Sequence, residues 1–117
     1  MNSLEKAKKI GEIIDNKKGE DVSVLKVAGI TSITDYYVIA TAKNTIHAKS
    51  LCDEIEEKMR KSDIQPRNIE GYQSAMWILM DYDNVIVHIF YEETRKFYDL
   101  ERLWMDAERI TIGNDNK

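Results

Sequence analysis

The sequence has few of the residues that cross-link, break or loosen a chain. Its 117 residues include one cysteine, one proline and five glycines, which excludes a disulfide framework and a flexible low-complexity linker. The lone Cys52 lies on a helical pattern, where an isolated thiol is usually a small buried hydrophobe. We therefore expect one domain, long enough to bury a real core, in a reducing compartment.

Basic residues are outnumbered by acidic ones. The chain has 17 Lys and Arg against 21 Asp and Glu, a formal net charge of -4 and a pI near 5.2. A protein that holds nucleic acid through its phosphates needs clustered Lys and Arg, and here the basic residues are scattered. We expect little direct contact with nucleic acid, and a basic partner if the partner is charged.

Long apolar runs are also absent. The longest one, near Trp77, is far too short to cross a bilayer. Residues 1–18, MNSLEKAKKIGEIIDNKK, have no apolar h-region, and their acidic side chains argue against a transit peptide. The sequence thus predicts a cytoplasmic protein with no membrane partner.

Patterns typical of catalysis or metal binding are scarce. The two histidines and Cys52 have no zinc-site spacing, and His88, inside a strand pattern, is more often a hydrogen-bonded core histidine than a general base. Asp81 and Asp83 form a D-x-D, which in nucleotidyltransferases holds magnesium against a triphosphate. Acidic residues at a bend are usually turn residues, and no glycine-rich phosphate loop accompanies them. We expect no catalysis, cofactor or metal; the alternative is a metal-dependent nucleotidyltransferase that uses Asp81 and Asp83.

The first half of the chain contains helical and extended patterns. Apolar residues at helical spacing follow Ser3, a plausible N-cap. Strand-forming runs cover Asp21–Val27 and Asp35–Ala42, and we expect them to pair as neighbours. Asn44 can cap a second helix that covers the sheet with an apolar stripe of Ile46, Leu51, Ile55 and Met59.

The second half concentrates large apolar side chains in SAMWILMDYDNVIVHIFYEETRKFYDLERLW, residues 74–104. Two strands, Met76–Met80 and Val85–Tyr91, flank the turn-like DYDN and predict a hairpin. Strand alternation sets Trp77 and Leu79 on one face and the intervening apolar side chains on the other. A sheet that is apolar on both faces but packed by helices mainly on one leaves a docking surface.

A charged, aromatic helix is predicted from Glu92 to Glu108. Its spacing sets an apolar stripe on one side, made of Phe97, Leu100, Trp104 and Ala107. Two interpretations of this stripe remain open. Either the helix simply packs on the sheet, or Trp104 joins Trp77 as a partly exposed anchor, because Trp and Tyr dominate interface hot spots.

The segments DYYVIATA and IEGYQSAMWILMDYDNVIVHIFYEETRKFYDLERLWMDA together resemble the ribosomal silencing factor family, also called Iojap-like proteins. The resemblance extends from about Val22 to Ala107. It implies an α/β fold related to nucleotidyltransferases but without known enzymatic activity. It also implies binding to protein fourteen of the large ribosomal subunit, so that the two subunits cannot join when nutrients are short.

The resemblance and the patterns together predict one α/β domain over residues 1–112 and a polar tail over 113–117. The expected fold is nucleotidyltransferase-like, a mixed sheet with helices packed mainly on one face. A homodimerisation module is a further alternative, and the sequence leaves open whether the free protein is a monomer or a homodimer. The residues expected to bind the partner are Trp77, Leu79, Met80, Asp81, Tyr98, Asp99, Leu100, Glu101 and Trp104.

Overall fold

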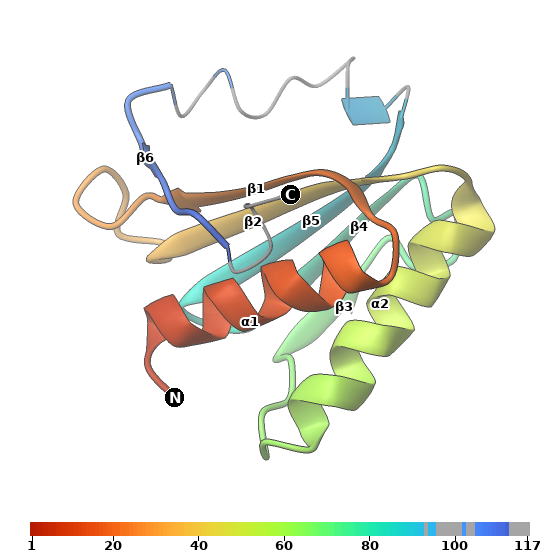
Figure 1. Cartoon of the computed structure of the whole chain (residues 1–117), viewed down its shortest axis with the longest axis horizontal. Coiled ribbons are helices and arrows are strands. Elements are labelled where there is room, and N and C mark those ends of the chain that lie inside the picture. The colour runs from red at the N-terminus through yellow and green to blue at the C-terminus, as the bar shows by residue number, and fades with distance from the viewer. Residues whose placement is uncertain (93, 96–101, 103–104, 113–117) are drawn as a thin grey trace.

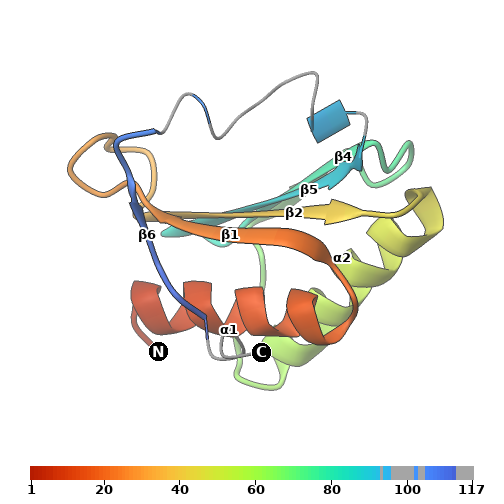
Figure 2. The same ribbon diagram turned by 45° about the horizontal axis from the view of Figure 1, so that its top comes forward.

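Helices α1 and α2 lie side by side on one face of a mixed six-stranded sheet (Figures 1 and 2). The structure is a computed structural model, and it describes residues 1–92, 94–95, 102 and 105–112. The predicted single α/β domain, with helices on one face of a mixed sheet, is confirmed. Its elements are α1 (Ser3–Asn16), β1 (Glu20–Lys26), β2 (Tyr36–Ala42), α2 (Thr45–Arg60), β3 (Asn68–Glu70), β4 (Trp77–Asp81), β5 (Val85–Tyr91) and β6 (Glu108–Arg109).

The strands lie in the order β3-β4-β5-β2-β1-β6. The pairing of β1 with β2 is antiparallel, and so is the β4–β5 hairpin; both predictions are confirmed. The central pair, β2 and β5, is parallel. The connection between them runs through α2, β3 and β4, which is long enough for a parallel crossover. The sequence patterns missed β3 and β6, which have three and two residues and mostly exposed polar side chains.

The helix N-termini are closed by asparagines. In α1 the cap is Asn2, not the expected Ser3: the Asn2 Oδ1 accepts the Glu5 amide at 2.8 Å, and the Asn2 amide donates to the Glu5 carboxylate at 3.0 Å. In α2 the expected cap Asn44 is confirmed, since its side chain accepts the His47 amide at 2.7 Å. Both helices therefore begin where a side chain satisfies an otherwise free amide.

One member of the expected α2 stripe was wrong. Ile46 is 79% exposed, whereas Leu51, Ile55 and Met59 are fully buried. Ile46 precedes Leu51 by five positions, which turns it about 140° around the helix, away from the sheet. Cys52 takes a buried position instead. Its thiol pKa is raised to about 12, mainly by burial and further by the nearby Asp53 and Glu56 carboxylates. This thiol is a packing residue, as expected.

The last described segment passes around the β1 edge of the sheet. The predicted helix to Glu108 is wrong at its end, because residues 105–106 form a turn and Glu108 and Arg109 pair with Lys26 and Leu25 as β6. Backbone pairing along the free edge of β1 outweighs the helical pattern there. The chain then reaches the helix side of the sheet, where Ile112 packs near Gly11.

The main core fills the space between the sheet and the two helices. None of the helices in the described part of the chain has the length and apolar content that a bilayer crossing requires. Residues 113–117 lie outside the described range, so the polar tail stays a prediction.

Candidate functional site

The face of the sheet opposite α1 and α2 carries a second apolar cluster. We call it the aromatic face. Alternation along the strands sends every second side chain to it, away from the main core. Its buried members are Leu25, Val27, Ile39 and Phe90, and the partly buried Tyr37, Trp77 and Ala107 pack against them.

Aromatic rings meet at the middle of this face, where β4 pairs with β5. Trp77 lies opposite Phe90 in the antiparallel register, and their ring centroids are 5.0 Å apart at an interplanar angle of 29°. The Trp77 indole Nε1–H donates to the His88 Nδ1 at 3.0 Å. From the neighbouring strand β2, the Tyr37 ring meets the His88 ring edge-on at 5.1 Å and 79°. Three strands therefore fix the surroundings of one half-buried indole.

Within the aromatic face, His88 is a buried basic group whose pKa is strongly lowered. Only 5% of its surface is exposed, and burial lowers its pKa from 6.5 to about 4. Its ring is therefore neutral near pH 7, with Nδ1 accepting from Trp77 and the proton on Nε2. The expectation of a hydrogen-bonded core histidine is confirmed.

This pKa predicts a pH dependence of folding. Because the pKa of His88 is lower in the folded state, the unfolded chain takes up a proton first as the pH falls, so the fold has its full stability above about pH 6.5 and loses part of it as the pH falls to about 4. A difference of this size corresponds to about 3 kcal/mol in the free energy of unfolding. Urea unfolding over this pH range measures it. His88→Asn is the control, since it keeps His47 and all carboxylates; equal pH slopes in both proteins would refute the assignment.

The expected partner-binding residues do not all share this face. Trp77, Leu79 and Asp81 alternate on the side away from the helices, and each is half-buried. Met80 is a correction: it is fully buried in the main core beneath the helices, where no partner reaches it. Five others lie outside the described residues, namely Tyr98, Asp99, Leu100, Glu101 and Trp104.

The D-x-D pair is built into the β4–β5 turn. Asp81 Oδ1 accepts the Asp83 amide at 2.8 Å, and Arg67 Nη1 donates to Asp83 Oδ1, also at 2.8 Å. Asp83 itself has a φ of 73°, a conformation that Asp tolerates in tight turns. Within the described ranges, no group of three or more His, Cys, Asp or Glu side chains is arranged to hold a metal ion. The Asp81 carboxylate therefore closes the turn, and the Asp83 carboxylate links the turn to Arg67.

Two arginines that the sequence patterns missed fasten chain segments over the aromatic face. Arg95 Nη1 donates to the Asp21 carbonyl at 2.8 Å and to Thr41 Oγ1 at 2.7 Å. Arg109 Nη1 donates to Ser23 Oγ at 3.1 Å. Thr41 and Ser23 are buried hydroxyl residues on otherwise apolar strands, and a buried hydroxyl needs a hydrogen-bond partner. Polar residues at inward strand positions were the feature of the sequence that could have pointed to these arginines.

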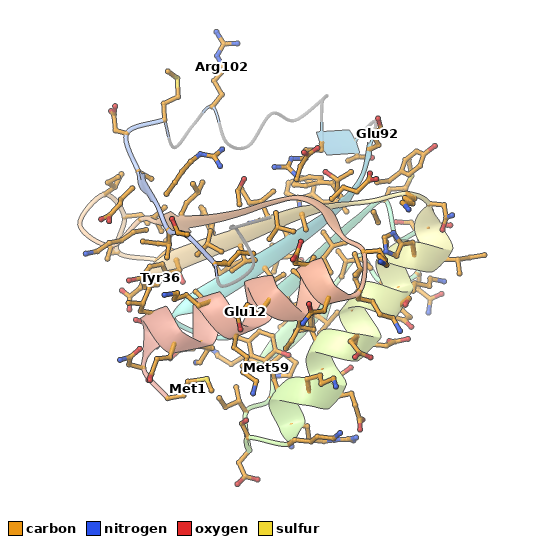
Figure 3. All side chains as sticks on the ribbon, in the orientation of Figure 1. Met1, Glu12, Tyr36, Met59, Glu92 and Arg102 are labelled. Carbon is orange, nitrogen blue, oxygen red and sulfur yellow. The ribbon has the colours of Figure 1, made fainter. Side chains whose placement is uncertain are left out.

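Several charged side chains are exposed on this side of the molecule. Glu92 and Arg102 both lie on the side of the sheet away from α1 and α2, whereas Glu12 and Met59 lie on the helix side (Figure 3). Asp106 and Glu108 are also exposed, and Met105 is 77% exposed. This side of the molecule thus combines an apolar cluster with exposed charged side chains, as protein interfaces do.

Comparison with known proteins gives consistent matches along the chain. The family model described as "Ribosomal silencing factor during starvation" matches residues 1–117. The ribosomal silencing factor of Bacillus subtilis is 33% identical over 107 residues, covering 92% of this chain and 91% of the relative. A mouse protein named for mitochondrial assembly of the ribosomal large subunit is 27% identical over 96 residues, covering 79% of this chain and 42% of that protein.

Solved structures have the same fold. A crystal structure of a protein from Chromobacterium violaceum superposes with a TM-score of 0.87 at 26% identity, covering 99% of this chain and 98% of that one. A second, from Bacillus halodurans, has a TM-score of 0.77 at 28% identity and covers 93% of this chain and 96% of that one.

Proposed function

Since this chain belongs to the ribosomal silencing factor family, we propose that it binds the large ribosomal subunit and stops the small subunit from joining it. The observation that supports this most is the aromatic face, a partly exposed indole in an apolar cluster on the side of the sheet opposite α1 and α2. Partly exposed aromatic anchors of this kind dominate protein interfaces. The mechanism is steric and needs no chemistry.

The proposed contact on the subunit is its ribosomal protein fourteen. A basic ribosomal protein suits a chain of net charge -4, because complementary charge raises the rate of association. The mouse relative is named for assembly of the large subunit, which agrees with this choice of subunit. We place the action in the cytoplasm, with little direct contact to nucleic acid.

The proposed interface combines described and undescribed residues. Trp77 and Leu79 supply its apolar centre, and Asp81 lies beside them at the end of β4. The remaining members lie outside the described residues and are proposed from the sequence pattern and the resemblance: Tyr98, Asp99, Leu100, Glu101 and Trp104. Purified protein mixed with large subunits should sediment with them and not with small subunits. A protein that stays in the supernatant would refute the proposal.

The charge complementarity is testable at two positions. Changing Asp99 and Glu101 together to Lys should weaken large-subunit binding and lower the association rate, with an effect that shrinks as salt rises. Stopped-flow binding at several salt concentrations measures both. The control exchanges Glu12, on α1 at the opposite side of the sheet (Figure 3), for Lys. Unchanged association at low salt would remove Asp99 and Glu101 from the interface.

We also propose that the protein is not an enzyme and has no cofactor. The double change Asp81→Asn and Asp83→Asn should leave large-subunit binding in place, because the Asp81 carboxylate closes the turn and the Asp83 carboxylate pairs with the exposed Arg67. Asn keeps a side-chain oxygen that can accept both of these hydrogen bonds. Melting temperatures with magnesium and nucleotide should not rise, since only a ligand of the folded state stabilises it. Magnesium-dependent nucleotide incorporation, lost in the double variant, would establish the nucleotidyltransferase instead.

The free protein is proposed to form a homodimer when no subunit is present. The aromatic face would then meet a second copy, so subunit and copy would compete for the same surface. Sedimentation equilibrium gives the mass of the free protein. A dimer that persists on the large subunit would assign the aromatic face to dimerisation alone.

A further inference from the structure

The Trp77 indole is held in one orientation by its neighbours. Its Nε1–H donates to His88 Nδ1 at 3.0 Å, and its ring stacks on Phe90 with centroids 5.0 Å apart. The His88 ring itself lies 5.9 Å from the indole at an angle of 39°. A hydrogen bond and a stack on different sides of the ring leave little freedom for the side-chain torsions.

The position of His88 is also fixed by its neighbours. It lies in β5 between the neighbouring strands β4 and β2, opposite Leu79 on one side and Ile39 on the other. The Tyr37 ring meets the His88 ring edge-on, and the Phe90 ring stacks on it, so both restrict the His88 ring further. The acceptor for the indole is therefore fixed by the rigid centre of the sheet.

The fold itself gains little from a histidine at this position. With Nδ1 accepting, the proton is on Nε2, which is buried, and no described residue accepts a hydrogen bond from it. A buried donor without a partner is unfavourable, and an apolar side chain of similar size would avoid it. The favourable contribution specific to histidine at this site is the acceptor for the Trp77 indole.

We propose that His88 is a positioning residue for partner binding, which holds the indole of Trp77 in its binding orientation before the partner arrives. This rests on the proposed function of the aromatic face. An indole that is already ordered in the free protein loses less rotational freedom on binding, so the affinity is higher. The role belongs to the Nδ1 acceptor and not to the bulk of the ring.

Two substitutions separate the acceptor from the bulk. His88→Leu keeps a similar volume and removes the acceptor, whereas His88→Asn places a side-chain oxygen near the position of Nδ1. In the free protein, the indole N–H signal of Trp77 in a ¹H–¹⁵N spectrum is identified by its loss in Trp77→Phe. His88→Leu should shift this signal and speed its exchange with solvent, and His88→Asn should keep it closer to wild type.

Binding and folding are measured on the same variants. His88→Leu should unfold at a urea concentration no lower than wild type at pH 7, yet bind large subunits about tenfold more weakly, the effect of ordering one large side chain. His88→Asn should recover most of that affinity. An unchanged indole signal or an unchanged affinity in His88→Leu would overturn the positioning role. Failure of the wild type to bind would instead overturn the proposed function, while the indole spectra would still report on the His88 contact.

Discussion

Replacing Trp77 with Ala is expected to weaken large-subunit binding by about thirtyfold or more while the free domain stays folded. Truncation of an interface hot spot costs roughly 2 kcal/mol or more, which corresponds to that change in affinity. A wholly buried Trp would instead cost about 3–5 kcal/mol of folding stability. Trp77 is half-buried, so its truncation should cost less stability than this. Urea unfolding and large-subunit affinity, measured on the same protein, separate the two effects.

The control for Trp77 is another exposed apolar side chain outside the aromatic face. Ile46 is 79% exposed at the start of α2, and Ile46→Ala should leave affinity unchanged. The same two measurements on Trp104→Ala decide whether that residue belongs to the interface or to the core. If Trp77→Ala unfolds early but binds normally below its unfolding midpoint, Trp77 is a core residue and the docking surface lies elsewhere.

Replacing Gly71 with Ala is expected to destabilise the fold by about 3 kcal/mol or more, since a left-handed backbone and a steric clash act together. Gly71 has a φ of 79°, and a Cβ there would lie 2.1 Å from the Trp77 carbonyl oxygen. The clash is with backbone at the first residue of β4, so the strand and the indole have to move. Affinity for the large subunit should fall with stability.

Gly29 provides the matched control for Gly71. Its φ is 88°, but a Cβ there would meet no atom within 4 Å. Gly29→Ala therefore introduces only the backbone strain, which costs about 1–2 kcal/mol. Comparison of the urea midpoints of the two variants isolates the clash at β4. Equal losses would show that β4 accommodates the added methyl group and that Gly71 does not fix the position of Trp77.

Local patterns were sufficient for the elements that the sheet and helix periodicities define. The two strands of the hairpin, the β1–β2 pair and the α2 cap Asn44 follow from alternation, turn residues and capping chemistry. Alternation also places Trp77 and Leu79 together on one face. The same rule excludes Met80 from that face, because it lies one residue from Leu79 and points into the main core.

Features that depend on distant residues were not predictable in the same way. Strand β6 exists because Glu108 and Arg109 meet the free edge of β1, which no local pattern records. The Arg95 contact joins residues 54 and 74 positions apart in the sequence. The Trp77 and His88 side chains become partners only through the register of β4 against β5, which sets Leu79 opposite His88 and Phe90 opposite Trp77.

The central claim is that the bound protein occupies space that the small subunit needs. Large subunits are saturated with the protein and then mixed with small subunits, and light scattering follows their joining. We expect the rate and extent of joining to fall in proportion to the fraction of large subunits occupied, and Trp77→Ala at the same concentration to restore joining. Large subunits that carry the protein, verified by sedimentation, and still join small subunits at the normal rate and extent would contradict the account.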